Sequence, residues 1–406
     1  MLKVSPMTNE TGLRLADELG KANRYLKAIA RDTVISEETT WNEIASIVAR
    51  GDAREYFDIG TQFQDKWKKD DSTEFNPVLN VTHFGHAILE DQEEVRGMYL
   101  QWDKLVPDAI VFDEPEAIYY TEDGLAAGTY HFAVGAAYGT GWTAGLNIQI
   151  TLTQALPAGG QIRINVPTDN AQSPIGKTFK TYGPDDLFTE IETGTVAEGT
   201  SGTDLGTTST ASAQKTNGQF NAIARVVYGN GRYKDSFIRQ WLNADAEEGE
   251  YWQQMNPWDR PAAAANTLNG FLWGCTAEFK AALKKVKITT ALNTVEGYAS
   301  DREDVYDKIF IPGLEQMYIS PQLAGAEGEY WEYWKEVLGR STPAEQYGTY
   351  EQLKMYPINS ASAAYYWLRS ANRGNAYHAW YIYSSGYVNS YTAYGAFRCA
   401  SACILC

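Results

Sequence analysis

Hydrophobic positions recur at helical spacing in two stretches near the beginning of the chain. The first predicts an N-terminal helix over 11–31, whose apolar stripe consists of Leu15, Leu19, Leu26 and Ile29. A narrow stripe of this kind needs a partner surface, either the body of the protein or further copies of the same helix. The second predicts a helix that begins after Thr40, because Thr40 and Glu43 have capping-box spacing and Gly51 follows the apolar positions.

Between residues 106 and 213 the pattern changes to alternating polar and apolar positions. The clearest alternating runs are 128–134, 146–152 and 161–166, and turn signals such as Asp123-Gly124 separate them. Period-two alternation interrupted by turns predicts an antiparallel β-sandwich or a similar module. Residues 198–212 are rich in Gly, Ser and Thr, so we expect a loop or linker there.

Helical spacing returns after this region. Residues 220–260 are predicted to be helical, with Phe237, Ile238, Trp241 and Leu242 on the apolar side. Residues 276–287 predict another helix with a basic end. The chain then finishes in a strand-and-loop region rich in Tyr, Ser, Ala and Asn.

Two alternating strands are predicted near the C-terminus, joined by the turn Ser384-Ser385-Gly386. On the first strand, Trp380 and Ile382 face one side. If that side joins the core, the opposite side is left exposed. The residues then exposed together are Tyr381, Tyr383, Tyr387 and Asn389.

The composition of this tail differs from that of the rest of the chain. The protein has 27 tyrosines and a net charge of −17, but its last acidic residue is Glu351, so residues 352–406 contain none. Tyr, Ser, Asn and Gly predominate in antibody paratopes, where tyrosine supplies contact area at low entropy cost. An exposed cluster of tyrosines therefore indicates a binding surface. A solvated hairpin is the alternative, since tyrosine also favours strands.

The residue types of the tail are restricted as well. Between Ala371 and Phe397, every residue except Trp380 is of a type encoded by codons that end in a pyrimidine, and Lys, Glu, Gln and Met are absent. Asparagine codons altered only at their adenines yield the same set of residues. The pattern suggests diversification at adenines.

Several short motifs of the tail resemble a known family. They are Trp367-Leu368-Arg369-Ser370, Asn372-Arg373-Gly374-Asn375-Ala376, Trp380, Ser385-Gly386, Val388, Arg398-Cys399-Ala400 and Ala402-Cys403. Together they look like the variable region of the target protein of a diversity-generating retroelement, in which a reverse transcriptase rewrites the end of the gene with errors at adenines. Where that family usually has proline, this chain has Ala371 and Ser401. Weaker similarity covers 41–63 and 228–243.

The resemblance implies an α+β fold, with a C-type-lectin-like domain of the formylglycine-generating-enzyme type. The domains would be an N-terminal helical segment at 1–40, a first lectin-like part at 41–105, an inserted β-rich module with its linker at 106–213, and the remaining lectin-like part at 214–406. The variable region would occupy 371–397.

The resemblance also assigns roles to residues. Diversified, ligand-binding positions would be Tyr377, His378, Tyr381, Tyr383, Tyr387, Asn389, Ser390, Tyr391, Thr392, Tyr394, Gly395 and Phe397, with Ser384 and Ile382 as further candidates. Scaffold positions would be Trp367, Arg369, Trp380, Val388 and Arg398.

The function implied is non-enzymatic ligand binding. Phage members of the family are tail-tip receptor-binding proteins, typically trimeric, so we expect a homotrimer in the virion that recognises a protein or glycan on the bacterial surface. A cell-surface display protein with the same variable domain is an alternative, and an oxidoreductase of the related enzyme fold is another. The oxidoreductase would need a reactive cysteine pair, for which Cys275 and Cys399 are candidates.

Other chemistry has weaker support. Cys399, Cys403 and Cys406 have the C-x3-C-x2-C spacing of an iron–sulfur site, but nothing follows Cys406 to build an enzyme barrel. His83 and His86 point to opposite faces of a predicted strand, which argues against a shared metal. The motifs of calcium-dependent sugar binding are absent. We therefore expect no catalytic residues, no metal and no cofactor.

Charge and hydropathy restrict the partners further. Asp and Glu number 51 against 34 Lys and Arg, which disfavours binding to nucleic acid through its phosphates. No apolar run approaches the roughly 18 residues of a membrane span, so we expect no membrane insertion. The first residues lack the apolar stretch of a signal peptide, so we expect no export by that route.

Overall fold

A computed structural model describes most of the chain. The described residues are 39–114, 119–121, 123–135, 141–164, 173–207, 229–255, 259–292, 302–321, 327–375 and 377–406. The predicted helix at 11–31 lies outside them, as does all but the end of the predicted segment 1–40.

The predicted fold class is wrong. Of the described residues, 37% lie in strands or bridges and 15% in helices, and the strands form several small sheets. The protein is therefore mostly β, and not clearly an α+β protein of the C-type-lectin kind. The reason lies in the short helices, of which the longest described, α2 (Trp41–Ala49), has 9 residues. Helical spacing over a longer stretch did not produce a long helix.

Helix α2 confirms the second predicted helix. Thr40 Oγ1 accepts a hydrogen bond from the Glu43 backbone N at 3.3 Å, and the Glu43 carboxylate accepts one from the Thr40 backbone N at 2.8 Å. This reciprocal capping box satisfies two backbone donors at the start of the helix. The predicted apolar face is buried, and its members are Ile44, Ile47 and Val48. A short helix, α3 (Ala53–Tyr56), follows.

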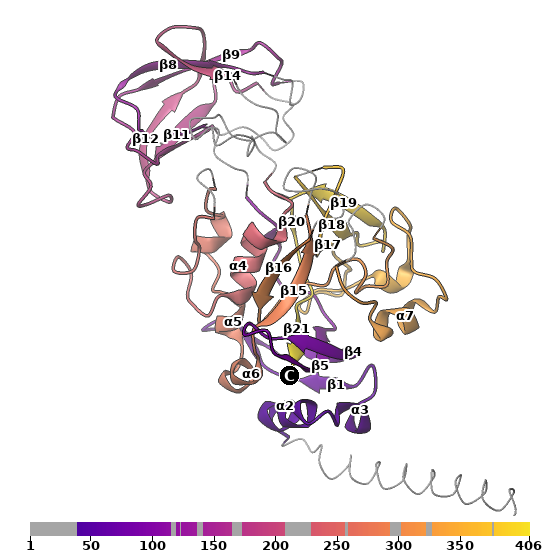
Figure 1. Cartoon of the computed structure of the whole chain (residues 1–406). Coiled ribbons are helices and arrows are strands. Elements are labelled where there is room, and N and C mark those ends of the chain that lie inside the picture. The colour runs from indigo at the N-terminus through magenta and orange to yellow at the C-terminus, as the bar shows by residue number, and fades with distance from the viewer. Residues whose placement is uncertain are drawn as a thin grey trace, which may run out of the picture.

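The main body, 39–114 with 229–406, contains one four-stranded sheet of order β1-β4-β5-β21. Its strands are β1 (Gln62–Gln64), β4 (Val78–Ile88), β5 (Glu94–Trp102) and β21 (Ala402–Leu405). Figure 1 shows α2 and α3 beneath this sheet, at the end of the body farthest from β18 and β19. The hairpin of β2 (Trp67–Asp70) and β3 (Thr73–Phe75) lies between β1 and β4 in the sequence. The last described strand, β21, thus pairs with β5, which lies about 300 residues earlier in the chain.

The rest of the main body consists of small sheets and short helices. The sheets are β15 (Val286–Ala291) with β16 (Arg302–Asp307), β17 (Tyr366–Ala371) with β18 (His378–Ile382) and β19 (Val388–Thr392), and β6 (Ile110–Val111) with β20 (Ala396–Phe397). The α-helices are α4 (Phe237–Asn243), α5 (Phe271–Gly274), α6 (Ala277–Ala282) and α7 (Glu332–Leu338), and the 3₁₀ helices are η1 (Tyr233–Asp235), η2 (Ala263–Asn266) and η3 (Glu351–Leu353).

The helices predicted over 220–260 and 276–287 are longer than those in the structure. Within 220–260 the described α-helix is α4 alone, and the helix predicted over 276–287 ends at Ala282. Strand β15 begins at Val286, where the run Val-Lys-Ile-Thr-Thr contains three β-branched residues beyond Val286 itself. β-Branched side chains favour strands, and pairing with β16 adds a partner that the sequence pattern does not reveal.

A second body, which we call the β module, comprises the described residues from 119 to 207. One sheet has the order β12-β11-β10-β7 and the other β13-β9-β8-β14. The strands are β7 (Tyr119–Tyr120), β8 (Gly128–Ala133), β9 (Asn147–Leu152), β10 (Gln161–Ile164), β11 (Thr178–Tyr182), β12 (Glu190–Thr195), β13 (Ala197–Glu198) and β14 (Thr203–Thr207). Strands β8, β9 and β10 confirm the three alternating runs.

Two details of the β module differ from expectation. Strand β14 lies inside the stretch 198–212 that was predicted to be a loop, and it pairs with β8 in parallel rather than antiparallel fashion. Its residues Thr203–Thr207 are mostly exposed, so backbone pairing with β8, and not side-chain burial, accounts for the strand. The remainder of the low-complexity stretch, 208–212, lies outside the described residues.

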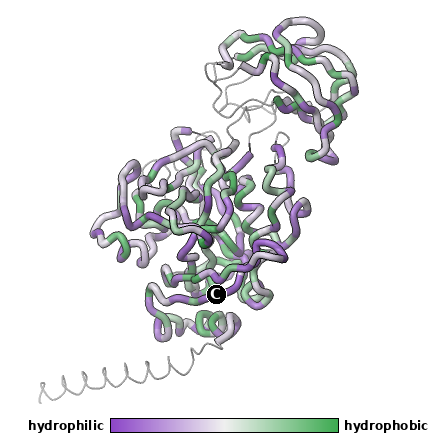
Figure 2. The backbone as a smooth tube through the Cα atoms, turned by 180° about the vertical axis from the view of Figure 1, so that it is seen from behind, coloured by the Kyte–Doolittle hydropathy of each residue, from purple (hydrophilic) through white to green (hydrophobic). Residues whose placement is uncertain are grey.

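The hydrophobic residues form two separate cores. One lies within the β module, between its two sheets, and includes Phe132, Trp142, Ile148 and Ile162. The other fills the main body and includes Trp367 and Trp380. Figure 2 shows apolar positions along the strands of both bodies and polar positions mostly in the connections. The limits 106 and 213 of the predicted insertion stay a prediction.

Candidate ligand-binding face

The sheet of β17, β18 and β19 has a register that assigns each side chain to one of two faces. Tyr381 lies opposite Asn389, and Ile382 lies opposite Val388. Because directly opposed residues point to the same side of a sheet, these two pairs belong to opposite faces. The turn between β18 and β19 depends on Gly386, which has a φ of 80° and where a Cβ would clash with the backbone of a neighbouring segment.

The inner face of this sheet is closed by the main body. Its fully buried residues are Tyr366, Trp380, Ile382 and Val388. The ring of Tyr347 packs on Trp380 with 5.3 Å between centroids. The segment that carries Tyr347 also pairs with the free edge of β19, since the Tyr347 backbone N donates to the Val388 carbonyl oxygen at 3.0 Å. The predicted core side of the hairpin therefore lies in the core.

The outer face carries a layer of aromatic side chains, which we call the aromatic face. It consists of Tyr365, Tyr383, Tyr387, Tyr391, Tyr394 and Phe397. The ring centroids are 4.7 Å apart for Tyr365 and Tyr383, and 5.4 Å apart for Tyr391 and Phe397. Tyr365 is 39% exposed and Tyr391 is 40% exposed. Tilted ring contacts at these distances hold the rings in one continuous surface.

Tyr381 shares this face but is not exposed. Only 1% of its surface is accessible, because Phe397 stacks on it at 4.7 Å and Tyr365 and Tyr391 cover its edges. Burial raises the pKa of the Tyr381 phenol above its usual value. The prediction that Tyr381 is exposed is therefore wrong. Alternation placed it on the correct side of the sheet, but β20 folds back over that position and carries Phe397 with it.

Asn389 also lies on the outer face, opposite Tyr381, and is half-buried. Its Oδ1 accepts a hydrogen bond from the Ser390 backbone N at 2.8 Å. The side chain of Asn389 also forms a hydrogen bond with the Tyr381 hydroxyl, which opposes the rise in the pKa of that phenol. Both side-chain groups of Asn389 thus have partners within the sheet.

Three predicted contact residues lie on the other face of the sheet. His378 pairs with Thr392 and Trp380 with Ser390, so His378, Ser390 and Thr392 share the side of Trp380. His378 Nδ1 lies 3.2 Å from Ser390 Oγ. Burial lowers the pKa of His378 to about 4, so its ring is neutral at pH 7. The structure does not bring these residues together with the tyrosines of the aromatic face.

The remaining predicted positions occupy three different settings. Tyr377 precedes β18, and its ring lies 5.1 Å from that of His378. Gly395 is buried, and a Cβ there would lie 2.8 Å from Tyr391 Cδ1, so a larger residue would displace the Tyr391 ring. Ser384 is half-exposed in the turn, whereas Ile382 is part of the core. Gly395 and Ile382 therefore offer no side-chain surface to a ligand.

Four of the five predicted scaffold residues are fully buried. They are Trp367, Arg369, Trp380 and Val388. Trp367 Nε1 donates to the Ile110 carbonyl oxygen at 3.0 Å, which joins β17 to β6. Arg398 is half-buried, and its Nε donates to the Pro107 carbonyl oxygen at 3.2 Å. These contacts attach the sheet to segments that precede the β module in the chain.

Arg369 belongs to a buried polar network beneath the sheet. Its Nη1 donates to the Ile311 carbonyl oxygen at 2.8 Å and to Gln316 Oε1 at 3.0 Å. The next residue, Ser370, donates through Oγ to the buried Glu327 carboxylate, which also accepts from the Ala291 backbone N at 2.9 Å. Burial raises the pKa of Glu327, while Arg369 opposes that shift. The network connects β15 and β17.

Sequence reasoning missed Tyr365 as part of the face. Tyr365 precedes β17, and its ring contacts Tyr381, Tyr383 and Phe397. Trp367 lies two positions later and also contacts Tyr381, so period-two alternation would have placed both on the tyrosine side. The alternation of Tyr365 and Trp367 was thus visible in the sequence. Tyr365 lies before Ala371, however, where the restricted set of residue types begins.

The chain enters and leaves the β module next to the aromatic face. On the entering side β6 pairs with β20, and the Asp113 backbone N donates to the Ala393 carbonyl oxygen at 3.0 Å. On the leaving side the Asn230 backbone N donates to Asp113 Oδ2 at 2.9 Å. Figure 1 shows the β module beyond β18, β19 and β20, at the opposite end of the main body from α2.

The four cysteines are free and buried. Burial raises the pKa of Cys275 and of Cys399 well above the usual value for a thiol. Since the thiolate is the nucleophile, these two residues are poorly suited to be the reactive pair of an oxidoreductase. Among the described residues, no group of three His, Cys, Asp or Glu side chains is arranged to hold a metal ion.

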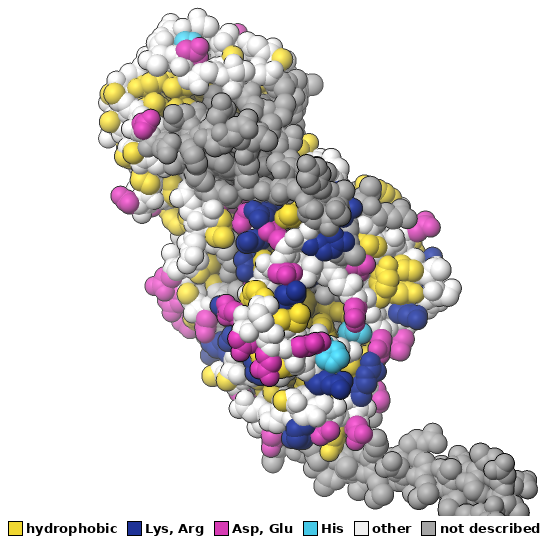
Figure 3. All heavy atoms as spheres, viewed as in Figure 1, with side chains coloured by type: hydrophobic (Ala, Val, Ile, Leu, Met, Phe, Trp, Pro, Cys, Tyr) yellow, Lys and Arg dark blue, Asp and Glu magenta, His cyan; other side chains and the backbone are white. Residues whose placement is uncertain are grey.

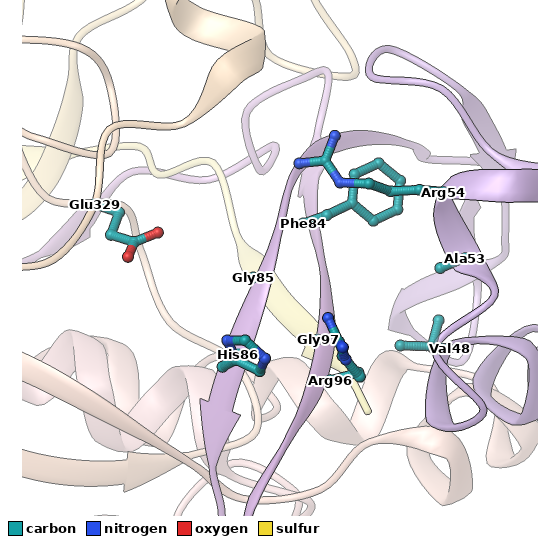
Figure 4. Close-up of a pocket in the computed structure, with 10 residues that line it drawn as sticks. Val48, Ala53, Arg54, Phe84, Gly85, His86, Arg96, Gly97 and Glu329 are labelled. Atoms are coloured by element: carbon teal, nitrogen blue, oxygen red, sulfur yellow. The ribbon is translucent and has the colours of Figure 1, made fainter.

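A cavity of about 310 Å³ lies far from the aromatic face, between the end of α2, α3 and the β4–β5 hairpin. Figure 4 shows the Arg54 side chain beside the Phe84 ring, with Arg96 and His86 on the neighbouring strands. Arg54 Nη2 lies 2.6 Å from Glu332 Oε1. At the rim, Glu329 pairs with His83 at 3.1 Å. The Arg54 guanidinium in this cavity thus already has an acidic partner within the protein.

The surface near these sites is of mixed charge. Figure 3 shows Lys and Arg side chains interspersed with Asp and Glu over the visible face of the main body. The excess of acidic residues in the whole chain does not make that face uniformly negative. Within the described ranges, no helix combines the length and the apolar character needed to cross a bilayer.

Comparison with known proteins gives one match. Residues 211–405 are similar to the family model described as Domain of unknown function (DUF6273). Neither the curated proteins nor the solved structures include a match to this chain. The matched segment contains β15 to β21 and the entire aromatic face. It excludes β1, β4 and β5, although β21 completes their sheet, so the main body extends beyond the matched residues.

Proposed function

We propose that this protein is a non-enzymatic receptor-binding protein of a phage or prophage tail, which recognises a protein or glycan on a bacterial surface through the aromatic face. The observation that carries the proposal is the aromatic face itself. Six aromatic side chains from residues 365–397 lie side by side, partly exposed, above an inner face whose centre, with Tyr366, Trp380, Ile382 and Val388, is fully buried.

The chemistry of the aromatic face suits adaptable recognition. Tyrosine rings offer large contact areas with few rotatable bonds, and their hydroxyl groups donate and accept hydrogen bonds. Contiguous exposed aromatic surface is also unusual on a protein that has no partner. Residues 352–406 contain no acid, so the segment that carries the face contributes no carboxylate side chain whose desolvation would oppose binding.

Retroelement diversification is part of the proposal. The support for it is the motif resemblance and the residue palette of 371–397, in which Trp380 is the exception and is also a fully buried side chain. Diversification that changes the exposed residues of the aromatic face, which we call the rim, and keeps the buried residues constant would alter which ligand is bound. The protein would still fold. If the protein is a trimer in the virion, three weak sites would act together through avidity.

Gene sequences from several isolates test the diversification. We expect substitutions to concentrate at exposed positions such as Tyr383, Tyr387 and Tyr391 and to spare Trp380 and Val388. A template repeat and a reverse-transcriptase gene are expected nearby. Equal variation inside and outside 371–397, or the absence of both elements, would overturn this part of the proposal.

A binding experiment tests the face directly. The triple variant Tyr383→Ala, Tyr387→Ala and Tyr391→Ala is expected to abolish adsorption to host cells while the protein still unfolds cooperatively. The matched control replaces Tyr56 and Tyr306, two tyrosines of the main body outside the face, with Ala. Adsorption that survives the triple change, or that is lost equally in the control, contradicts the proposal.

The alternative of a cell-surface display protein uses the same face. The two alternatives differ in where the protein is located. Fractionation of infected and uninfected cultures into virions and cell envelopes distinguishes them. We expect mass spectrometry to find the chain in purified virions. Finding it only in the envelope of uninfected cells would assign it to display instead, with the same binding chemistry.

A further inference from the structure

A second cavity lies where the β module meets the main body. Its volume is about 270 Å³, and it is lined by Arg163, Ile164, Lys180, Tyr182 and Arg260. Strands β10 and β11 carry the first four residues, while Arg260 comes from the main body between α4 and η2. Figure 1 shows β11 and β12 on the side of the β module that faces the main body.

The two bodies contact each other around this cavity. Gln161 Nε2 donates to the Asp259 carbonyl oxygen at 2.7 Å. The ring of Phe188 packs edge-on against Trp252, with 5.7 Å between centroids. These contacts place a basic residue of the main body, Arg260, opposite the outer surface of β10 and β11.

Arg163 is a buried cation without a close ion pair among the described residues, and Glu114 is a more distant acid that acts on it. It is 8% exposed, and among the described residues no carboxylate forms an ion pair with it. Its Nε and Nη2 donate to Gln161 Oε1 at 3.0 and 2.7 Å, and its Nη1 donates to the Leu187 carbonyl oxygen at 3.0 Å. The guanidinium also lies 3.8 Å from the centre of the Tyr182 ring. Neutral partners orient this charge but do not neutralise it.

Two further cations converge on the same space. Lys180 lies directly opposite Arg163 in the register of β10 and β11, an arrangement of like charges that destabilises a sheet. Arg260 approaches from the other body, and its Nε is buried without a hydrogen-bond partner within the described residues. Burial together with the nearby Arg260 lowers the pKa of Arg163 to about 9.

Two acids among the described residues, Glu190 and Glu114, interact with these three cations. Glu190 pairs with Lys180 at 2.5 Å at the exposed edge of the sheet. Glu114 lies near both Arg260 and Arg163 and accepts a hydrogen bond from the Ala263 backbone N at 3.3 Å. Burial raises the pKa of Glu114, which weakens it as a counter-ion. Glu114 is thus shared between Arg163 and Arg260, and neither of these two arginines has a carboxylate to itself among the described residues.

We propose that this cavity binds an oxyanion, a phosphate or sulfate group, held by Arg163, Lys180 and Arg260 at the junction of the two bodies. Guanidinium groups match the geometry of such oxygens and form short, charge-assisted hydrogen bonds with them. The volume lies just below the range of sites for drug-sized ligands, so a small anion with some water fits. A bound anion would contact both bodies and tie the β module to the main body.

The site is independent of the aromatic face and of the function proposed for it. The anion has two conceivable sources, a free inorganic ion or a phosphate of a bacterial surface polymer. Both present the same tetrahedral oxygens to the same residues. The experiment therefore includes both probes.

Calorimetric titration of the full chain at pH 7 tests the site. We expect inorganic phosphate to bind, and Lys180→Gln and Arg260→Gln each to weaken that binding at least tenfold. Lys177→Gln, a change in the same module outside the cavity, is the matched control and is expected to leave affinity unchanged. Each variant is checked for cooperative unfolding, and Arg163 is left intact because its hydrogen bonds hold the 187 loop.

The outcomes separate the possibilities. Binding of free phosphate that is lost in both variants supports a site for a free anion. Binding of poly(glycerol phosphate) alone, with the same tenfold loss, supports a site for a polymer-borne phosphate. If neither probe gives a signal beyond sodium chloride of equal ionic strength, or if the variants bind like the unaltered protein, the proposal is overturned.

Discussion

The two faces of the β17–β19 sheet contain similar residues but differ in what covers them. On the inner face, Tyr366, Trp380 and Val388 are all fully buried by the main body. On the outer face, exposure grades from 1% at Tyr381 to 40% at Tyr391. The centre of the inner face is packed core, and His378, Ser390 and Thr392 at its other end are half-buried. The outer face is instead a stack of rings whose lower layer is core and whose upper layer meets solvent.

The difference indicates how one small sheet can combine constancy with variation. A residue of the inner face contacts many neighbours at once, so its removal leaves a cavity that the surroundings fill only in part. A residue at the rim of the outer face contacts solvent and a few other rings, so its removal leaves little void. The buried residues thereby determine stability, whereas the residues at the rim are available for ligand contact. Substitutions in the two groups should therefore have different effects.

The largest effect is expected for Trp380→Ala. The indole is fully buried on the inner face and packs on Tyr347. Its loss should lower the free energy of unfolding by about 3–5 kcal/mol, measured by denaturant titration. Trp380→Phe, which keeps an aromatic ring, serves as the control with a smaller loss. A change below about 1 kcal/mol for the Ala variant would show that the inner face is not closed.

The next effect concerns Tyr381, which belongs to the outer face but lies in its buried layer. Tyr381→Ala should cost about 3 kcal/mol because Phe397 and Tyr391 would lose the ring on which they pack. Tyr381→Phe should cost about 1 kcal/mol, since only the hydroxyl is removed. If the Ala variant is as stable as the unaltered protein, Tyr381 belongs to the exposed rim after all.

The pH dependence of stability distinguishes the side of His378 from the tyrosine side. Burial lowers the pKa of His378 to about 4, whereas the ring in the unfolded chain titrates near 6.5. Between these values the unfolded chain binds more protons, so this group makes stability fall as the pH falls from about 6.5 to 4, by at most about 1.4 kcal/mol per pH unit. Below pH 4 the group adds no further loss.

The variant His378→Asn isolates that contribution, because all other groups titrate in both proteins. Denaturant unfolding at several values between pH 4 and pH 7 should give a shallower slope for the variant. Parallel slopes would mean that His378 is solvated and available to a ligand, as its role among the diversified positions first suggested.

The smallest effect on stability is expected at the rim. Tyr391 is 40% exposed, so Tyr391→Ala should change the free energy of unfolding by less than about 1 kcal/mol while it weakens host-cell adsorption. Tyr391→Phe is the matched control, which keeps the ring and removes the hydroxyl. A loss of stability comparable to that of Tyr381→Ala would abolish the distinction between rim and buried layer.

Local features were predictable from the sequence where the relevant interactions are themselves local. The Thr40–Glu43 capping box joins residues three apart, so spacing alone identified the start of α2. Alternation likewise identified β8, β9 and β10, and it placed Trp380 and Tyr381 on opposite sides of β18. The prediction of the fold class failed because the fold depends on which strands pair across long distances in the sequence, as β21 does with β5.

The candidate face was predictable in part for the same reason. Period-two alternation assigns Tyr383, Tyr387 and Asn389 to one side without any tertiary information. It cannot reveal that β20 returns over Tyr381 or that Tyr365 joins the rim, since both contacts bridge strands separated in the chain. It also cannot place Arg260 of the main body against Arg163 of the β module.

The sequence by itself thus determined the side on which each residue of a strand lies, the helix start at Thr40 and the unusual, acid-free composition of the tail. Only the tertiary structure decided which of the two sides is covered, and by what. The physical reason is that direction follows from backbone geometry, a property of neighbouring residues, whereas burial depends on side chains that arrive from distant segments. The aromatic face therefore exists as a surface only because β17, β19 and β20 are assembled beside one another.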